Sequence, residues 1–450
     1  NFIRLAFLIS LMFIDVHTHI TLDQMKNNDG ANLIYQGVTT AVTGNCGNSE
    51  NPSSAKELMN LINDMSISNP SINIATLIGH NTVRNIVLQG NKNRSATKKE
   101  IQELTDIVEE AIDVGAIGFS SGLMYPSGSF AGKNEIETIL RRVAKKGKVY
   151  TTHMRDEGDM LIESVQESLR TAERANVRLQ ISHHKAVGKK NFGKVNKTLE
   201  MISIARQNLD VNTDIYLYNA TSTILSILIP KTIIQKVDGD IKKISKLEEY
   251  KHLQELEGLQ NLCENGWKDV LIVQHKNKGL IGKSVYDIAG GKDLALIYFK
   301  IIKEDQNSRG IFMNISSYDD IRSVVQQPFT MIASDGYLYD TKNQLIVHPR
   351  NYGNITKFLS QYVRKNILSL EEGLKKLTSL PAEKFSLKSR GVIKSGYFAD
   401  IVIFNLNEIN NIETVLRPYA LSEGIKYVIC NGKIIFENNK IIGRNGYFLN

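Results

Sequence analysis

Cysteine is scarce in this chain, which has only three cysteines among 450 residues. They stand far apart, at Cys46, Cys263 and Cys430. An odd and sparse set in a chain of this length excludes a disulfide framework, and it is typical of proteins from a reducing compartment. The sequence therefore predicts a cytoplasmic protein whose cysteines are free for packing or for chemistry.

Long hydrophobic runs and blocks of basic residues are also missing. No apolar stretch is long enough to cross a bilayer, and the hydrophobic opening at Phe2–Ile14 has no clear small-residue cleavage site. The formal net charge is +8, but Lys and Arg are scattered among acidic residues and asparagines. Such scatter is typical of a solvated surface rather than of a nucleic-acid footprint. We therefore expect no membrane and no nucleic acid among the partners.

Eight apolar and often β-branched runs divide most of the chain, and segments with helical spacing lie between most of them. The runs are Leu11–Val16, Thr39–Thr43, Ile72–Ile78, Ala116–Ser120, Lys148–Thr152, Arg178–Ser182, Asp210–Tyr218 and Phe329–Ser334. Between two of them, Thr97–Val114 places Ile101, Leu104 and Val108 on one helical face. This alternation, with continuously apolar strands, predicts an α/β protein built as a parallel (β/α)8 barrel that is covered by helices.

Two segments depart from this alternation. Residues 220–281 are charged and carry few strand signals, so we interpret them as an insertion that could act as a lid. A peripheral decoration is the alternative. After residue 390, short strands and glycine turns predict a small β-rich unit. We therefore expect a barrel over residues 11–390, interrupted at about 220–281, and a C-terminal β-rich domain over residues 391–450.

Polar side chains follow six of the eight expected strands, at the end where parallel barrels carry their chemistry. In chain order they are His17 and His19, Cys46, His80, His153, His183 and Asp335. His17 and His19 are two residues apart at a strand end, so their imidazoles point the same way. Imidazole and thiolate are ligands of zinc and other transition metals. The cluster therefore predicts a metal centre at this rim of the barrel.

The placement of the residues suggests which of them bind most tightly. His153 and His183 follow adjacent strands, and Cys46 stands between glycines in a turn where a thiolate can approach an ion closely. Three such ligands would leave the fourth position of a Zn²⁺ ion open for water. His17 and His19, with Cys46 as the bridge, could hold a second or weaker ion.

Each of these residues has a plainer interpretation when taken alone. Cys46 could be a small buried filler, and Asp335, which precedes a glycine, could be a simple turn residue. His80 fits a hydrogen-bonding rim histidine better than a ligand, and His184 points away from His183 and is expected to be structural. At the end of the eighth strand, however, Asp335 is placed to accept a proton from water and return it to a departing amine.

The stretches that carry these residues resemble the N-acyl-D-amino-acid deacylase (D-aminoacylase) family of the amidohydrolase superfamily. In order they are Phe13–His19 (FIDVHTH), Gly37–Gly47 (GVTTAVTGNCG), Gly79–Arg84 (GHNTVR), Gly115–Ala131 (GAIGFSSGLMYPSGSFA), Tyr150–Asp159 (YTTHMRDEGD), Gln180–Ala186 (QISHHKA), Ile332–Gly336 (IASDG), His348–Gly353 (HPRNYG) and Thr378–Phe385 (TSLPAEKF). The resemblance implies a TIM-like metallo-dependent hydrolase barrel with a small β-sandwich and a lid insertion. It also implies zinc-dependent hydrolysis of N-acyl-D-amino acids to a carboxylate and a free D-amino acid.

The resemblance implies the same metal ligands and the same role for Asp335 as the interpretation above. It places Cys46 where most of the superfamily has a carboxylated lysine as the bridging ligand. It adds three residues that match groups holding the substrate carboxylate, namely Lys185, Tyr216 and Arg350. A Lys/Arg pair beside a phenol is chemically suited to that role.

Two alternatives stay open on the sequence. The chain could be another amidohydrolase, such as a D-dipeptidase or a cyclic-amide hydrolase, although Cys46 and the pair of Lys185 and Arg350 favour linear acylated amino acids. It could also be a non-catalytic scaffold of the same fold. Family members normally open with several strands that build half of the small sandwich, and this chain begins almost at the first barrel strand. We therefore expect a sandwich whose amino-terminal half is missing.

Overall fold

A barrel of eight parallel strands forms the centre of the computed structural model, which describes residues 8–50, 52–90, 92–229, 263–340, 342, 346–415 and 417–450. The strands are β2 (Phe13–Asp15), β3 (Val38–Thr43), β4 (Asn73–Gly79), β5 (Gly118–Gly122), β6 (Val149–His153), β7 (Arg178–Ile181), β8 (Val211–Ile215) and β12 (Thr330–Ile332). They pair in this order, and a parallel bridge between Thr18 and Gly336 joins the first strand to the last. The predicted barrel is confirmed, and each predicted run overlaps one of these strands.

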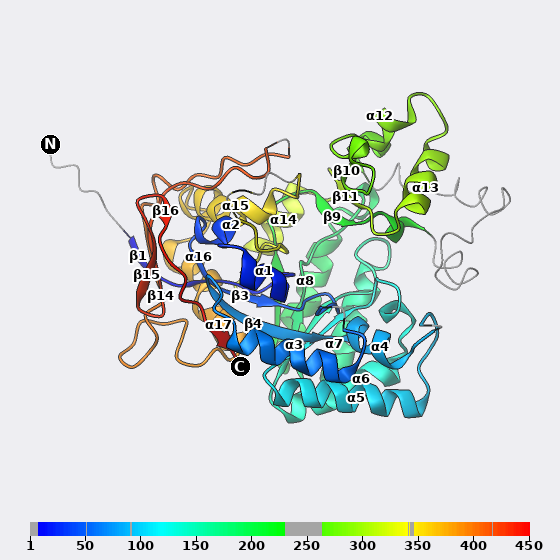
Figure 1. Cartoon of the computed structure of the whole chain (residues 1–450), viewed down its shortest axis with the longest axis horizontal. Helices are drawn as coiled ribbons and strands as arrows, with labels where there is room; N and C mark the ends of the chain where they lie inside the picture. The colour runs from blue at the N-terminus through cyan, green and yellow to red at the C-terminus, as the bar shows by residue number, and fades with distance from the viewer. Residues whose placement is uncertain are drawn as a thin grey trace.

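Helices cover the outside of the barrel (Figure 1). The principal ones are α3 (Ala55–Ile67), α4 (His80–Val87), α5 (Lys98–Asp113), α6 (Lys133–Lys145), α7 (Leu161–Ala175), α8 (Lys194–Ala205), α14 (Tyr318–Val325), α15 (Arg350–Phe358) and α16 (Leu370–Leu377), with the short α1 (Leu22–Asn27), α2 (Ala31–Ile34) and α17 (Ser379–Lys384). In α5 a capping box between Thr97 and Glu100 fixes the start, and the predicted face with Leu104 is buried. Within the described residues, no helix combines the length and apolarity needed to cross a membrane.

The C-terminal residues complete the hydrogen bonding of one barrel strand. β4 pairs with β3 over Asn73–Thr76 but with β5 only from Leu77 onward. β17 (Phe448–Leu449) pairs in parallel with the remaining edge of β4 at Ile74 and Ala75. The end of the chain is therefore fastened to the base of the barrel, opposite the rim that carries the polar cluster.

A five-stranded antiparallel sheet lies beside the barrel, at the left of Figure 1. Its order is β1 (Leu8–Leu11), β13 (Ile401–Phe404), β14 (Ile425–Cys430), β15 (Lys433–Glu437) and β16 (Lys440–Ile441). The first predicted run is split, because Leu11 pairs with Ile401 in this sheet and the barrel strand begins only at Phe13. The small sheet thus takes one strand from the amino-terminal side and four from the region after residue 390.

A second, smaller unit follows β8 and lies at the upper right of Figure 1. Its antiparallel sheet has the order β10 (Val270–Gln274), β11 (Arg309–Phe312) and β9 (Thr221–Ile224), accompanied by α12 (Val285–Ala289) and α13 (Leu294–Glu304). Residue 281, where we expected the barrel to resume, falls between β10 and α12, so the insertion extends to β11. The central part of the expected insertion, residues 230–262, lies outside the described residues.

Candidate metal centre

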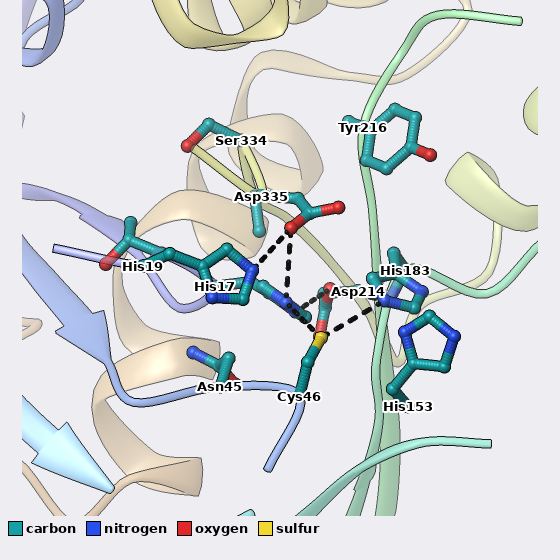
Figure 2. A network of polar contacts seen from close by, with 12 residues as sticks. His17, His19, Asn45, Cys46, His153, His183, Asp214, Tyr216, Ser334 and Asp335 are labelled. Carbon is teal, nitrogen blue, oxygen red and sulfur yellow. Dashed lines mark hydrogen bonds and ion pairs between the residues drawn. The ribbon is translucent and has the colours of Figure 1, made fainter. Parts of the chain in front are cut away.

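Six polar side chains from five strands meet at the carboxyl end of the barrel (Figure 2). His17 and His19 follow β2, Cys46 follows β3, His153 ends β6, His183 follows β7, and Asp335 follows β12. All except His19 are buried, and the His19 side chain is 19% exposed. Residues far apart in the sequence are therefore brought together, as predicted from their positions at the carboxyl ends of the expected strands.

The donor atoms lie close enough to share an ion. Cys46 Sγ is 3.3 Å from His17 Nε2 and 3.5 Å from His183 Nε2. One donor atom from each member lies within 4.8 Å of the others in three groups: His17, His19 and Cys46; Cys46, His153 and His183; and His17, His183 and Asp335. A tetrahedral zinc ion at usual bond lengths keeps a thiolate sulfur and an imidazole nitrogen roughly 3.5 Å apart. The spacing of the donors therefore fits a zinc ion.

Unusual backbone conformations direct three of these side chains into the centre. The φ angles of Cys46, His183 and Asp335 are 53°, 33° and 50°. Non-glycine residues rarely adopt such angles, which are unfavourable by about 1–3 kcal/mol and persist where the surroundings impose them. At Gly44, before the cysteine, a Cβ would lie 2.2 Å from the carbonyl oxygen of Leu77. The turn that presents Cys46 thus requires a glycine at its start.

Buried carboxylates orient two of the imidazole rings from behind. Asp214 on β8 lies 3.2 Å from Nδ1 of His17, and Glu157 lies 2.8 Å from Nδ1 of His183. Both Nε2 atoms consequently face Cys46. A carboxylate behind a histidine fixes the ring and makes its other nitrogen a better donor to a metal.

His153 presents an unsatisfied nitrogen to the centre. Its Nε2 lies 3.4 Å from Sδ of Met124, whereas its buried Nδ1 has no hydrogen-bond partner among the described residues. A buried polar atom without a partner is unfavourable by about 1–3 kcal/mol. A bound cation would satisfy this atom. His153 differs from other buried histidines with an unpartnered Nδ1 because it forms a donor group with Cys46 and His183, and this supports the fit of the donor set to a metal.

The electrostatics of the centre favour the anionic forms of Cys46 and Asp335. Burial alone would raise the pKa of the Cys46 thiol, but His17 and His183 outweigh it and hold the pKa well below its usual value. Burial would also raise the pKa of Asp335, and Arg350 and His17 hold it well below its usual range. A thiolate and a carboxylate that each form donor groups with His17 and His183 attract a divalent cation.

The three residues expected to hold a carboxylate also converge, next to Asp335. The Arg350 guanidinium carbon lies 4.5 Å from the centre of the Tyr216 ring, and Lys185 Nζ lies 5.5 Å from it. Both cations have acidic partners, because Arg350 is 3.0 Å from Asp335 and Lys185 is 2.7 Å from Glu157. Arg350 Nε, however, is buried without a hydrogen-bond partner in the described part of the chain. One guanidinium N–H is therefore available to a further acceptor.

The sequence interpretation missed three acidic residues of the site. Asp15 accepts hydrogen bonds from the backbone N–H groups of His17 and Ser334, which ties β2 to β12, and burial raises its pKa to about 6. Asp214 and Glu157 are the others. Asp15 and Asp214 lie inside apolar strand runs, where a carboxylate needs a buried partner. The occurrence of an acidic residue inside an apolar run was the feature of the sequence that could have identified Asp15 and Asp214.

His80 and His184 stay outside the cluster, as expected. Nε2 of His80 lies 2.7 Å from a carboxylate oxygen of Glu135, and Nε2 of His184 lies 2.8 Å from the Thr198 hydroxyl. Both residues are fully buried, and each has its Nε2 hydrogen-bonded and its Nδ1 without a partner among the described residues. Neither belongs to a group of converging donor atoms in the described part of the chain. They are therefore structural histidines rather than members of the metal centre.

The contact between Asp214 and His17 gives a first testable expectation. Asp214→Asn removes the charge behind the imidazole, so we expect zinc affinity at the site that uses His17 to fall by about 10- to 100-fold. Competition with a chromogenic chelator measures this affinity. Asp210→Asn is the matched control, because Asp210 precedes the same strand and pairs with Lys384 at its far end. Equal zinc affinities in the two variants would contradict the role of Asp214.

Comparison with known proteins extends the similarity over nearly the whole chain. A model of the amidohydrolase family matches residues 344–436. The chain is 32% identical to a D-aminoacylase of Alcaligenes xylosoxydans xylosoxydans over 96% of its own length and 85% of that protein.

Two solved structures share the fold. A D-aminoacylase investigated for the role of its binuclear metal centre has a TM-score of 0.82 at 30% identity, covering 98% of this chain and 89% of that one. An N-acyl-D-glutamate deacylase of Bordetella bronchiseptica, complexed with zinc and a phosphonate mimic of the tetrahedral intermediate, has a TM-score of 0.83 at 29% identity. That match covers 98% of this chain and 88% of the deacylase. Barrel, small sheet and insertion are thus all within the region of similarity.

Proposed function

Since the chain belongs to the D-aminoacylase family of metal-dependent amidohydrolases, we propose that it hydrolyses N-acyl-D-amino acids to a carboxylate and a free D-amino acid. The observation that carries the proposal is the convergence of Cys46, His153 and His183 opposite Asp335. A non-catalytic scaffold would have no need to keep this donor set, its oriented rings and an ionised carboxylate together.

We propose zinc as the metal of this reaction. Cys46, His153 and His183 would hold the tightly bound ion, and His17 and His19, with Cys46 as the bridge, would hold a second and weaker one. Thiolate and imidazole together are characteristic zinc ligands. When bound, the ion lowers the pKa of water and polarises the substrate carbonyl.

Asp335 is the proposed general base and acid. Its carboxylate lies 2.9 Å from His19 Nε2 and 3.5 Å from His17 Nε2, and it forms a donor group with His17 and His183. It therefore borders the proposed ligands of both ions. From there it accepts the proton of the attacking water as the carbon–oxygen bond forms. It then delivers that proton to the amide nitrogen as the carbon–nitrogen bond breaks, and the D-amino acid leaves with a neutral amine.

Lys185, Tyr216 and Arg350 are the proposed holders of the substrate carboxylate. A carboxylate beside the Tyr216 ring would satisfy the free Nε of Arg350 and would interact with two cations at once. Such an anchor sets the distance from the carboxylate to the amide that faces Asp335. It favours linear N-acyl amino acids over cyclic amides, which have no free carboxylate to bind.

The test is an assay of the zinc-loaded chain with paired N-acetyl-D- and N-acetyl-L-amino acids, a D-dipeptide and a hydantoin. We expect hydrolysis of the N-acetyl-D-amino acids at a rate at least about 100-fold above that of the L enantiomers. Faster turnover of the dipeptide or the hydantoin would favour the alternative amidohydrolase activities. A folded, zinc-loaded sample that hydrolyses none of these compounds would reject the proposal.

A further inference from the structure

The pocket that contains the metal centre has a volume of about 550 Å³ and extends to the insertion. Besides Cys46 and Asp335, it is lined by Arg309 at the start of β11 and by Tyr337, which follows Asp335 by two residues. β11 is the middle strand of the sheet that the insertion forms. The insertion therefore contributes a charged side chain to the wall of the site.

Arg309 differs from the other cations of this pocket because it has no acidic partner. The lysine and arginine side chains that line the pocket are Lys185, Arg309 and Arg350. Lys185 and Arg350 each pair with a buried carboxylate. The half-buried Arg309 guanidinium lies 5.9 Å from the centre of the Tyr337 ring, and it makes no hydrogen bond or ion pair with the described residues. Its N–H donors are therefore available to a ligand.

Arg309 and Lys185 lie at different ends of the donor cluster. Lys185 Nζ is 3.1 Å from Nδ1 of His183. The Tyr337 ring, over which Arg309 lies, is 5.6 Å from the ring of His19. Figure 2 shows His19 and His183 on opposite sides of the cluster. A molecule that crosses the metal centre from the Lys185 end therefore approaches Tyr337 and Arg309.

The proposed binding mode directs the acyl group of the substrate toward this second end. In an N-acyl amino acid, the carboxylate and the acyl group lie on opposite sides of the amide. Asp335, which the amide faces, is 3.0 Å from Arg350 and 2.9 Å from Nε2 of His19. A substrate whose carboxylate is held at Arg350 therefore extends its acyl group past His19 toward Tyr337. A carboxylate at the end of that acyl group would match the planar fork of the Arg309 guanidinium.

The acidic residue in the same pocket is less suited to select an acyl group. Glu50 also lines the pocket and could pair with an ammonium group. Its Oε1, however, already accepts a hydrogen bond from the backbone N–H of Leu22 at 2.5 Å. Burial and the neighbouring Asp23 both raise the pKa of Glu50, so its surroundings disfavour its negative charge. The pocket therefore favours an anionic acyl group over a cationic one.

We propose that Arg309 recognises the acyl group and that the chain prefers N-acyl-D-amino acids whose acyl group ends in a carboxylate, as in N-succinyl and N-glutaryl compounds. This inference rests on the proposed function, and it concerns the acyl group rather than the side chain of the amino acid. Hydrolysis breaks the same carbon–nitrogen bond as before, and water supplies the new oxygen. The products are a dicarboxylate and a free D-amino acid.

The first test compares an N-succinyl compound with its neutral monoamide, the N-succinamyl compound, for each D-amino acid of the assay above. We expect kcat/KM of the zinc-loaded full chain to be higher for the succinyl compound by about 10-fold or more. An equal or lower value, or faster hydrolysis of the cationic N-β-alanyl compound, would overturn this proposal and leave the proposed function intact. Hydrolysis of none of these compounds, nor of the N-acetyl compounds, would remove both.

The second test changes the charge of the side chain by Arg309→Gln and Arg309→Glu. We expect the ratio of kcat/KM for the succinyl compound to that for the monoamide to fall by about 10-fold in Arg309→Gln and further in Arg309→Glu, with the zinc content unchanged. Arg170→Gln is the matched control, because Arg170 is exposed on α7 and outside the pocket lining. It should keep the wild-type ratio. A wild-type ratio in either Arg309 variant would contradict the assignment.

Discussion

Asp335→Asn is expected to retain the wild-type zinc content and to lower kcat by about 10³-fold or more. The substitution keeps the size and the hydrogen-bonding outline of the side chain but removes its ability to take up a proton from water. The donor atoms of Cys46, His153 and His183 form a group without Asp335, so the tight ion does not depend on its carboxylate. Steady-state kinetics and elemental analysis of the same preparation measure both quantities.

The control for this substitution is Asp106→Asn, which changes an exposed aspartate on α5 far from the barrel mouth. We expect its kcat and zinc content to equal those of the wild type. Turnover of Asp335→Asn near the wild-type rate would remove Asp335 from the reaction. Loss of stoichiometric zinc in this variant would instead make Asp335 a ligand of the tight site.

Cys46→Ala is expected to have the second large effect, the loss of the tightly bound zinc together with a decrease in activity of about 10³-fold or more. Cys46 is common to two of the three donor groups, so its removal weakens both proposed ion positions at once. Its thiolate is also the anion that lies 3.3 Å from His17 and 3.5 Å from His183. Without it, neutral imidazoles provide most of the ligand field, and affinity for a divalent cation decreases.

Cys430→Ala provides a matched control for the loss of a buried thiol. Cys430 lies on β14 in the small sheet and is as buried as Cys46. We expect its removal to reduce stability by about 1 kcal/mol and to leave zinc content and kcat unchanged. Dialysis against limiting zinc followed by metal analysis compares the two variants. Wild-type zinc affinity in Cys46→Ala would contradict the assignment of Cys46 as a ligand.

The barrel could be predicted from the sequence because each strand lies within one short run of residues, and these runs alternate with segments of helical spacing. All seven residues of β4 and all five of β6 are buried, as expected for parallel strands covered by helices. Once the strands are placed, the rule that barrel chemistry lies at their carboxyl ends brings His17, Cys46, His153 and Asp335 together. These residues can therefore be assigned to the site from their positions at the strand ends, without knowledge of where their side chains lie.

Other features could not be predicted because they depend on contacts between distant residues. β9 and β11 of the insertion pair although Thr221 and Phe312 are 91 residues apart, and nothing local in either strand specifies its partner. Leu11 looks like the start of a barrel strand until its pairing with Ile401 places it in the small sheet. Asp214 becomes part of the site only through its contacts with His17 and with the backbone N–H of His183, both distant from it along the chain.

The backbone at the centre departs from local preference where the chemistry requires it. Cys46, His183 and Asp335 adopt positive φ angles that their residue types disfavour. Sequence propensity predicts relaxed turns at these positions. Contacts such as the hydrogen bond from the His183 N–H to Asp214 at 2.8 Å hold the turns in place. Backbone strain of this kind is expected at functional sites, where tertiary contacts override the conformational preferences of individual residues.

The most direct test is X-ray absorption spectroscopy at the zinc edge of the protein loaded with one equivalent of zinc. If Cys46, His153 and His183 hold the ion, the first shell contains one sulfur at about 2.3 Å and nitrogen or oxygen atoms at about 2.0–2.1 Å. Any zinc that Cys46→Ala still binds should lack the sulfur contribution, whereas Cys430→Ala should bind one equivalent of zinc and keep this contribution. A wild-type shell made only of nitrogen and oxygen would contradict the assignment on which the proposed reaction depends.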